Sequence, residues 1–205
     1  MNFKNIALLF VIASSLSFTA RAQYFSIGPS VGFQDTWITY DMNDDNKLVF
    51  NPGWNAGASF VYSTESHWGF GADLKYSMEG VSIKTESLDL TSDWNLSYLR
   101  LPLRAIYFFG DYGNAVRPKV FAGPTMGLLL ASKLDGHDEK EGTNGFDFGL
   151  HAGAGINFRL AEGIWLNTDI TYTQGLIDVD QEDEISDGNN LNGNVGVNVG
   201  VLFGL

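Results

Sequence analysis

The sequence predicts an all-β protein, an eight-stranded antiparallel up-and-down transmembrane β-barrel, and three observations lead to that class. Between Phe146 and Phe158, every even position is apolar and every odd position is polar or glycine. Because alternate side chains of a strand point to opposite faces, this stretch is a ribbon with one apolar side. Soluble strands usually have about 5–6 residues, whereas a strand that crosses a bilayer in a barrel needs roughly 9–11. Eight such stretches occur, and the links between them alternate between short and long.

Each predicted strand has an apolar residue at nearly every second position. In order, the strands are Tyr24–Phe33, Trp54–Tyr62, Trp68–Met78, Tyr98–Phe109, Pro118–Leu130, Phe146–Phe158, Ile164–Tyr172 and Leu191–Leu205. In the first four, the apolar residues run from Phe25 to Phe33 at odd positions, Trp54 to Tyr62 and Trp68 to Met78 at even positions, and Leu99 to Phe109 at odd positions. In the last four they run from Val120 to Leu130, Phe146 to Phe158 and Ile164 to Tyr172 at even positions, and Val195 to Leu205 at odd positions.

The links between the predicted strands place the protein in the cell outer membrane. The long links are Gln34–Gly53, Glu79–Asn95, Ala131–Gly145 and Thr173–Asn190, and the short ones are Ser63–His67, Gly110–Arg117 and Arg159–Gly163. Outer-membrane barrels have short periplasmic turns and long outer loops, and an even strand count returns both termini to the periplasm. The order of the links therefore indicates that the first strand runs outward.

Alternation alone also fits a soluble lipocalin-like barrel, whose apolar side faces inward. The composition of the two faces distinguishes a membrane barrel from a soluble one. The apolar positions carry no charged residue, and a Lys or Arg there would cost about 2–4 kcal/mol at the bilayer midplane. The opposite face is rich in glycine, which suits a narrow lumen. It also carries the charged residues Asp73, Lys75, Arg100, Arg104, Lys119, Asp147 and Asp169. Aromatic residues bracket the apolar band at both ends, as interfacial girdles do, so the apolar face is predicted to contact lipid.

Three prolines fall inside predicted strands, namely Pro29, Pro102 and Pro124. Because proline cannot donate a hydrogen bond to the strand ladder, we expect β-bulges or strand ends at these positions.

The first 22 residues have the pattern of a secretory signal peptide. A basic start and an apolar run lead to the A-x-A sequence Ala20–Ala22, so residues 1–22 are predicted to be cleaved and residues 23–205 to form one barrel domain. Loss of Lys4 and Arg21 changes the formal net charge from −12 to −14, which disfavours nucleic acid as a partner. Cysteine is absent, so we expect no disulfide, thiolate metal site or cysteine nucleophile.

Four short stretches resemble the PorT-type outer-membrane β-barrel family of Bacteroidota. They are Leu74-Lys-Tyr-Ser-Met-Glu-Gly80, Tyr98-Leu-Arg-Leu-Pro-Leu103, Val120-Phe-Ala-Gly-Pro-Thr-Met-Gly127 and Val197-Asn-Val-Gly-Val-Leu-Phe-Gly-Leu205. The resemblance implies an eight-stranded outer-membrane barrel, mostly without an assigned activity, and some members are linked to type IX protein secretion. The chain departs from the family at Arg100, where relatives often carry an acid, and at Leu205, where a terminal aromatic is common.

The charged residues of the lumen face are the first candidate site, with Glu79 near the outer rim. Buried charges must be paired, and the interior of an eight-stranded barrel is just wide enough for side chains to fill it. We therefore expect a lumen charge network that forms a salt-bridged plug. The alternative is a narrow pore or gate for ions or small solutes.

The predicted outer loops are strongly acidic and hold 18 of the 24 acidic residues. The richest segments are Asp178–Asp187 and Asp41–Asn46. Divalent cations are one interpretation, but Asp41–Asn46 lacks the sixth-position glycine and the distal Glu of a calcium loop. A solvated acidic surface is favoured, and no metal or cofactor is expected.

No catalytic residues are predicted. His67, His137 and His151 are far apart in sequence, and neither Gly-x-Ser-x-Gly nor His-Glu-x-x-His occurs. Some eight-stranded barrels are lipid A acylases or deacylases, but His151 has the parity of the lumen, so such an enzyme is the weaker alternative. The sequence thus predicts a filled barrel with a structural or interaction role at the cell envelope. We expect contact with outer-membrane lipid and with an envelope or secretion protein through the extracellular loops.

Overall fold

The computed structural model describes residues 25–39, 46–85, 87, 89–180 and 190–205, and all of its regular elements are β-strands. The predicted signal peptide, residues 1–22, lies outside the described residues. In the described part of the chain, no helix is long and apolar enough to cross a membrane.

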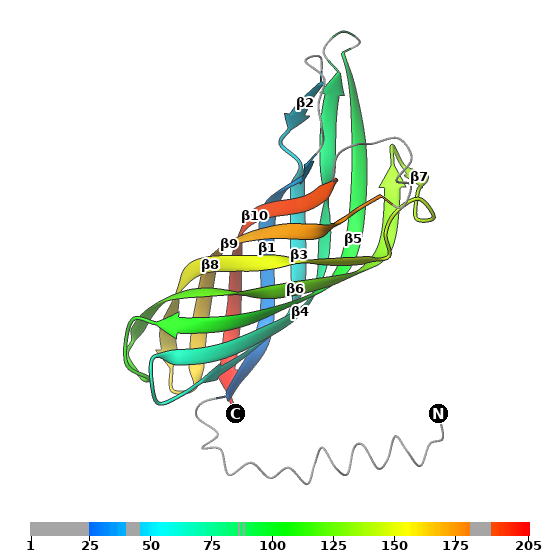
Figure 1. The fold of residues 1–205 in the computed structure, drawn as a ribbon. Helices are drawn as coiled ribbons and strands as arrows, with labels where there is room; N and C mark the ends of the chain where they lie inside the picture. Colours follow the sequence, from blue (N-terminus) through cyan, green and yellow to red (C-terminus); the bar gives the residue numbers. More distant parts are fainter. Residues whose placement is uncertain (1–24, 40–45, 86, 88, 181–189) are drawn as a thin grey trace, which may run out of the picture.

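Eight antiparallel strands form a closed ring, which confirms the predicted fold class (Figure 1). These strands are β1 (Phe25–Thr39), β3 (Pro52–Ser63), β4 (Trp68–Thr85), β5 (Leu90–Phe108), β6 (Val116–Leu134), β8 (Phe146–Ala161), β9 (Ile164–Asp178) and β10 (Leu191–Gly204). Each pairs with the next in this order, and β10 closes the ring on β1. We call the end of the barrel with the long links the loop end and the other the turn end. Two short strands add to the loop end, where β2 (Asn46–Val49) pairs with β4 and β7 (His137–Asp138) pairs with β6.

The strands are longer at the loop end than the sequence pattern predicted. The predicted loop Glu79–Asn95 is wrong in its extent, because β4 and β5 stay paired from Glu79↔Leu96 to Thr85↔Leu90. This hairpin stands above the barrel with β2 at its side (Figure 1). Regular backbone pairing, which needs no apolar alternation, carries these strands beyond the apolar band.

The expectation of bulges or strand ends at the three prolines is wrong. On one side each proline pairs with a residue of the neighbouring strand, Pro29 with Ala58, Pro102 with Thr125 and Pro124 with Leu150. On its other side the ladder skips two residue pairs and resumes in the same register, at Gly28 and Pro29 between β1 and β10, at Leu101 and Pro102 between β4 and β5, and at Gly123 and Pro124 between β5 and β6. Each missing donor therefore interrupts the ladder locally, while neighbouring pairs hold the alignment. The register shifts in the described ladders lie elsewhere, beside Ser97, Arg159 and Leu191.

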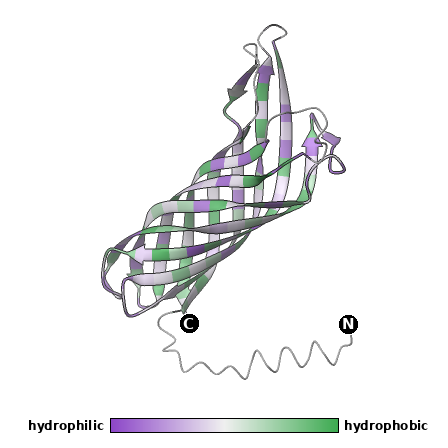
Figure 2. Ribbon diagram, viewed as in Figure 1, coloured by the Kyte–Doolittle hydropathy of each residue, from purple (hydrophilic) through white to green (hydrophobic). Residues whose placement is uncertain are grey.

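The apolar positions of the pattern lie on the outside of the barrel, as predicted. Val31, Phe70 and Leu150 are more than half exposed, and Figure 2 shows hydrophobic and hydrophilic residues alternating along the strands. Aromatic pairs mark both ends of this face. At the turn end, the ring centroids of Phe25 and Tyr62 lie 5.6 Å apart, and at the loop end those of Trp54 and Tyr76 lie 5.3 Å apart.

Candidate functional site

All seven charged residues predicted for the lumen lie inside the barrel. Six of them, Asp73, Arg100, Arg104, Lys119, Asp147 and Asp169, are buried, and the Lys75 side chain is only 11% exposed. They project from five strands, β4, β5, β6, β8 and β9, because inward parity recurs at every second residue of each strand. Strands far apart in sequence thus bring their charges to one layer.

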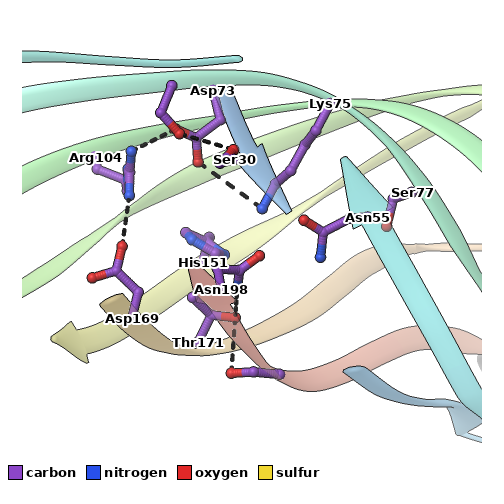
Figure 3. Close-up of polar contacts among 12 residues, drawn as sticks. Ser30, Asn55, Asp73, Lys75, Ser77, Arg104, His151, Asp169, Thr171 and Asn198 are labelled. Carbon is purple, nitrogen blue, oxygen red and sulfur yellow. Dashed lines mark hydrogen bonds and ion pairs between the residues drawn. The ribbon is translucent and has the colours of Figure 1, made fainter. Parts of the chain in front are cut away.

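Arg104 and Lys119 hold the part of this layer nearer the turn end. The Arg104 guanidinium contacts two carboxylates, with Nη2 2.5 Å from Asp73 Oδ1 and Nη1 3.5 Å from Asp169 Oδ2 (Figure 3). Lys119 Nζ lies 2.9 Å from Asp169 Oδ1 and donates a hydrogen bond to Asn167 Oδ1. Lys75 Nζ is 4.0 Å from Asp73 Oδ2, at the limit of an ion pair.

Arg100 holds the part nearer the loop end. It makes a bidentate contact with Glu79, with Nε 2.9 Å from Oε1 and Nη2 2.5 Å from Oε2, and its Nη1 lies 2.6 Å from Asp147 Oδ2. Asn192 Nδ2 also donates to Glu79 Oε2 at 2.9 Å. Gly127 makes room for this group, since a Cβ there would lie 2.7 Å from Arg100 Nη1.

Glu79 belongs to the charge network of the lumen, although the sequence pattern predicted it near the outer rim of the barrel. It is 2% exposed and fully inside the network. The signal was its odd parity, which continues the series Asp73, Lys75 and Ser77 once β4 is known to extend beyond Met78. With Glu79 included, this buried layer has four acids and four bases and is formally neutral. Neutrality is what allows so many charges to be buried together.

His151 sits between the two groups. Its Nδ1 lies 3.0 Å from Thr173 Oγ1, and its ring stacks on that of Phe121 at 5.6 Å between centroids. Its Nε2 is buried without a hydrogen-bond partner among the described residues. Figure 3 shows the ring facing the hydrogen-bonded pair Thr171 and Asn198. The other two histidines are far from it along the chain and exposed, His67 in a turn and His137 in β7, so the structure assembles no histidine cluster.

Two apolar clusters cap the charged layer, and sequence reasoning did not predict them. The cluster at the turn end consists of Val61, Ile106, Phe108, Phe121, Trp165 and Leu202. The cluster at the loop end consists of Ile38, Val81, Leu96, Tyr98, Leu129 and Val179. Below the turn-end cluster, the buried Arg117 guanidinium stacks on Phe108 at 3.9 Å from the ring centroid. The sequence does indicate these clusters, because their members are apolar residues at inward positions. The indication is weak, since their neighbours in sequence are outward apolar residues.

The space left in the lumen is small. One cavity of about 20 Å³ lies beside Arg100 and His151, and another of about 10 Å³ lies beside Arg104 and His151. A cavity needs roughly 10–15 Å³ to hold one water molecule. Each of these two cavities therefore has room for about one water.

Little of the predicted acidic loop surface can be placed. Most of the segments Asp41–Asn46 and Asp178–Asp187 lies outside the described residues. Among the described side chains, no group of three or more His, Asp or Glu residues is arranged to hold a metal ion.

Comparison with known proteins identifies the architecture. The family model described as "Outer membrane protein beta-barrel domain" matches residues 13–181. Among solved structures, OprG from Pseudomonas aeruginosa is similar at a TM-score of 0.57 and 18% identity, covering 87% of this chain and 94% of OprG. Neisserial surface protein A is similar at a TM-score of 0.57 and 16% identity, covering 88% of this chain and 97% of that protein. No curated protein sequence matches. At these identities the structural likeness concerns the fold.

Proposed function

We propose that this chain, which belongs to the outer membrane protein beta-barrel domain family, serves the cell envelope as a filled barrel that presents its loop end to a protein partner. The protein lies in the outer membrane, so its outward apolar face contacts lipid. The proposed role is structural or interactive.

The observation that carries the proposal is the three-layered filling of the lumen. A solute on the axis would meet the apolar cluster of Leu96 and Tyr98, then the ion pairs of Arg100 and Arg104, then the cluster of Phe108 and Trp165. Breaking a buried ion pair by removing one partner costs about 3–5 kcal/mol. Side-chain motion that opens a path through several such pairs would be correspondingly rare, which favours a plug over a pore.

The loop end supports the interaction part of the proposal. The β4–β5 hairpin projects beyond the barrel and is stiffened by β2 on one edge, while Asp135 accepts hydrogen bonds from Asp93 N and Ser92 Oγ on the other. A stiffened projection, on a chain whose predicted outer loops are acidic, is suited to a partner with a basic surface. The PorT-type resemblance favours an envelope or secretion protein as that partner. We propose no catalytic role, in line with the separation of the three histidines.

Two measurements test the proposal. Planar-bilayer recordings of the purified barrel should show no stable single-channel steps, and reproducible conductance would favour the pore instead. Photo-crosslinking from Leu90, at the tip of the hairpin, should capture an envelope protein in cells, whereas the same probe at Ser66 in a turn on the opposite side should not. Equal capture from both sites would contradict display through the loop end.

A further inference from the structure

The dipeptide Asn-Gly occurs twice in the chain, in two very different places. Asn144-Gly145 lies in the link between β6 and β8 at the loop end, whereas Asn192-Gly193 lies inside β10. In such a pair the glycine nitrogen can attack the side-chain carbonyl carbon of the asparagine, because glycine has no Cβ to hinder the approach. The attack expels ammonia and closes a succinimide ring, which water then opens to aspartate or isoaspartate. The reaction therefore needs no reagent other than water.

Of the two dipeptides, the one at the loop end is open to this reaction. Gly145 is exposed, and its backbone N–H has no hydrogen-bond partner among the described residues, so the attacking nitrogen is free. Gly193 instead has ladder partners on both sides within β10, and Asn192 is 2% exposed. Attack in β10 would require the ladder to open first. We therefore expect Asn144 to react and Asn192 to be protected.

Asn144 ties the link between β6 and β8 to the end of β9. Its backbone N–H donates to Val179 O at 2.7 Å. Its Nδ2 donates to Asp178 O at 2.8 Å and to Asp180 O at 3.4 Å. Val179 is 2% exposed and belongs to the apolar cluster at the loop end of the lumen. The Asn144 amide thus holds in place the segment that carries part of this cluster.

Deamidation would turn this attachment into repulsion. It replaces the Nδ2 donor by a carboxylate oxygen, which can only accept hydrogen bonds. That oxygen would face the two carbonyl oxygens of Asp178 and Asp180 that the amide now contacts. The side chains of these two residues add acidic groups on the same segment. The product is therefore expected to release the end of β9 from the link.

We propose that Asn144 is a site of spontaneous deamidation, which converts the loop end from a closed state to an open state in which Val179 leaves the apolar cluster. The ion pairs of Arg100 and Arg104 lie deeper in the lumen and do not involve this segment, so the barrel stays plugged. The inference rests on the contacts of the loop end and is independent of the partner proposed there.

The first test follows the reaction itself. The mature barrel in lipid vesicles is incubated at neutral and at mildly alkaline pH, and peptide mass spectrometry measures the conversion of both asparagines. Asn144 should convert about tenfold or more faster than Asn192, and faster at the higher pH, because the attacking nitrogen must lose its proton. Gly145→Ala hinders the attack and should slow the conversion about tenfold, while its Cβ meets nothing within 4 Å. Equal conversion of both asparagines, no conversion of Asn144, or undiminished conversion in Gly145→Ala would overturn the site.

The second test follows the open state. The Val179 N–H donates to Asn190 O at 2.9 Å and should exchange its hydrogen slowly in fresh protein. In aged wild type and in Asn144→Asp, exchange in peptides that cover residues 176–180 should be about tenfold faster. The matched control Asn114→Asp adds the same charge at an exposed asparagine of the β5–β6 turn and should leave this exchange unchanged. Heat-modifiable gel migration shows that each variant is folded. Slow exchange in folded Asn144→Asp, as in fresh wild type, would contradict the open state.

Discussion

Removal of Arg100 should lower the free energy of unfolding more than removal of Arg104. The acidic partners of Arg104 keep other basic residues nearby, whereas those of Arg100 do not. Arg100→Ala leaves Glu79 and Asp147 buried with no other base within 4.0 Å among the described residues. Arg104→Ala leaves Asp169 still paired with Lys119 at 2.9 Å and Asp73 near Lys75 at 4.0 Å. The two deletions therefore create different amounts of unpaired buried charge.

Removing one partner of a buried ion pair costs about 3–5 kcal/mol. We expect Arg100→Ala to lower the free energy of unfolding by about 5 kcal/mol and Arg104→Ala by about 3 kcal/mol. Arg159→Ala, at an exposed position, should change it by no more than about 0.5 kcal/mol and serves as the control. The assay is reversible urea unfolding of the refolded barrel in lipid vesicles, followed by tryptophan fluorescence and by heat-modifiable gel migration.

A triple variant isolates the electrostatic cause from lost packing. In the Arg100→Ala background, Glu79→Gln and Asp147→Asn neutralise the stranded acids, and we expect most of the lost stability to return. The reasoning is refuted if Arg100→Ala costs less than about 1 kcal/mol, or if the triple variant is no more stable than the single one.

Three further substitutions, the first with a matched control, probe other parts of the barrel. Gly127→Ala should destabilise by about 1–3 kcal/mol, because its Cβ would meet the Arg100 guanidinium, whereas Gly145→Ala, with open space around it, should be nearly neutral; urea unfolding checks both. Phe108→Ala empties part of the turn-end cluster and should cost about 3–5 kcal/mol without producing conductance in planar bilayers. Val199→Lys, on the outer face between the aromatic pairs, should cost about 2–4 kcal/mol in vesicles, and full stability of that variant would contradict its contact with lipid.

Which side chains of a strand face the lumen was predictable from the sequence, because alternation between the two faces is a local property. Once Phe146–Phe158 is recognised as a strand, the position of Asp147 in the lumen and of Leu150 on the outside follows from alternation alone. The same parity places Arg100 and Arg104 inside. It does not tell which acid each arginine meets. Arg100 of β5 reaches Asp147 of β8 over Gly127 of β6, which pairs with both residues, so the contact depends on the register of two ladders.

The ends of the strands were less predictable, for a physical reason. Beyond the bilayer both faces of a strand can be solvated, so alternation fades, as at Thr91, Ser92 and Asp93 of β5, which are all exposed. The pattern therefore ended at Met78 and left Glu79 in a loop. The two apolar clusters of the lumen were not predicted because there both faces of the strand are apolar. Trp165 and Phe108 are inward residues next to outward apolar ones, and an apolar run has no visible period.

The filled lumen can be tested most directly with thiol chemistry, since the chain has no cysteine of its own. Ser59→Cys, Ser77→Cys and Thr125→Cys place near-isosteric thiols at buried lumen positions, and Ser66→Cys and Ser92→Cys place them at exposed positions toward the two ends. In intact barrels, a charged, membrane-impermeant maleimide should label the two exposed thiols within minutes and leave the three lumen thiols unmodified until urea unfolds the protein. Labelling of the lumen thiols at the rate of the exposed ones would show an open water-filled channel and contradict the plugged barrel.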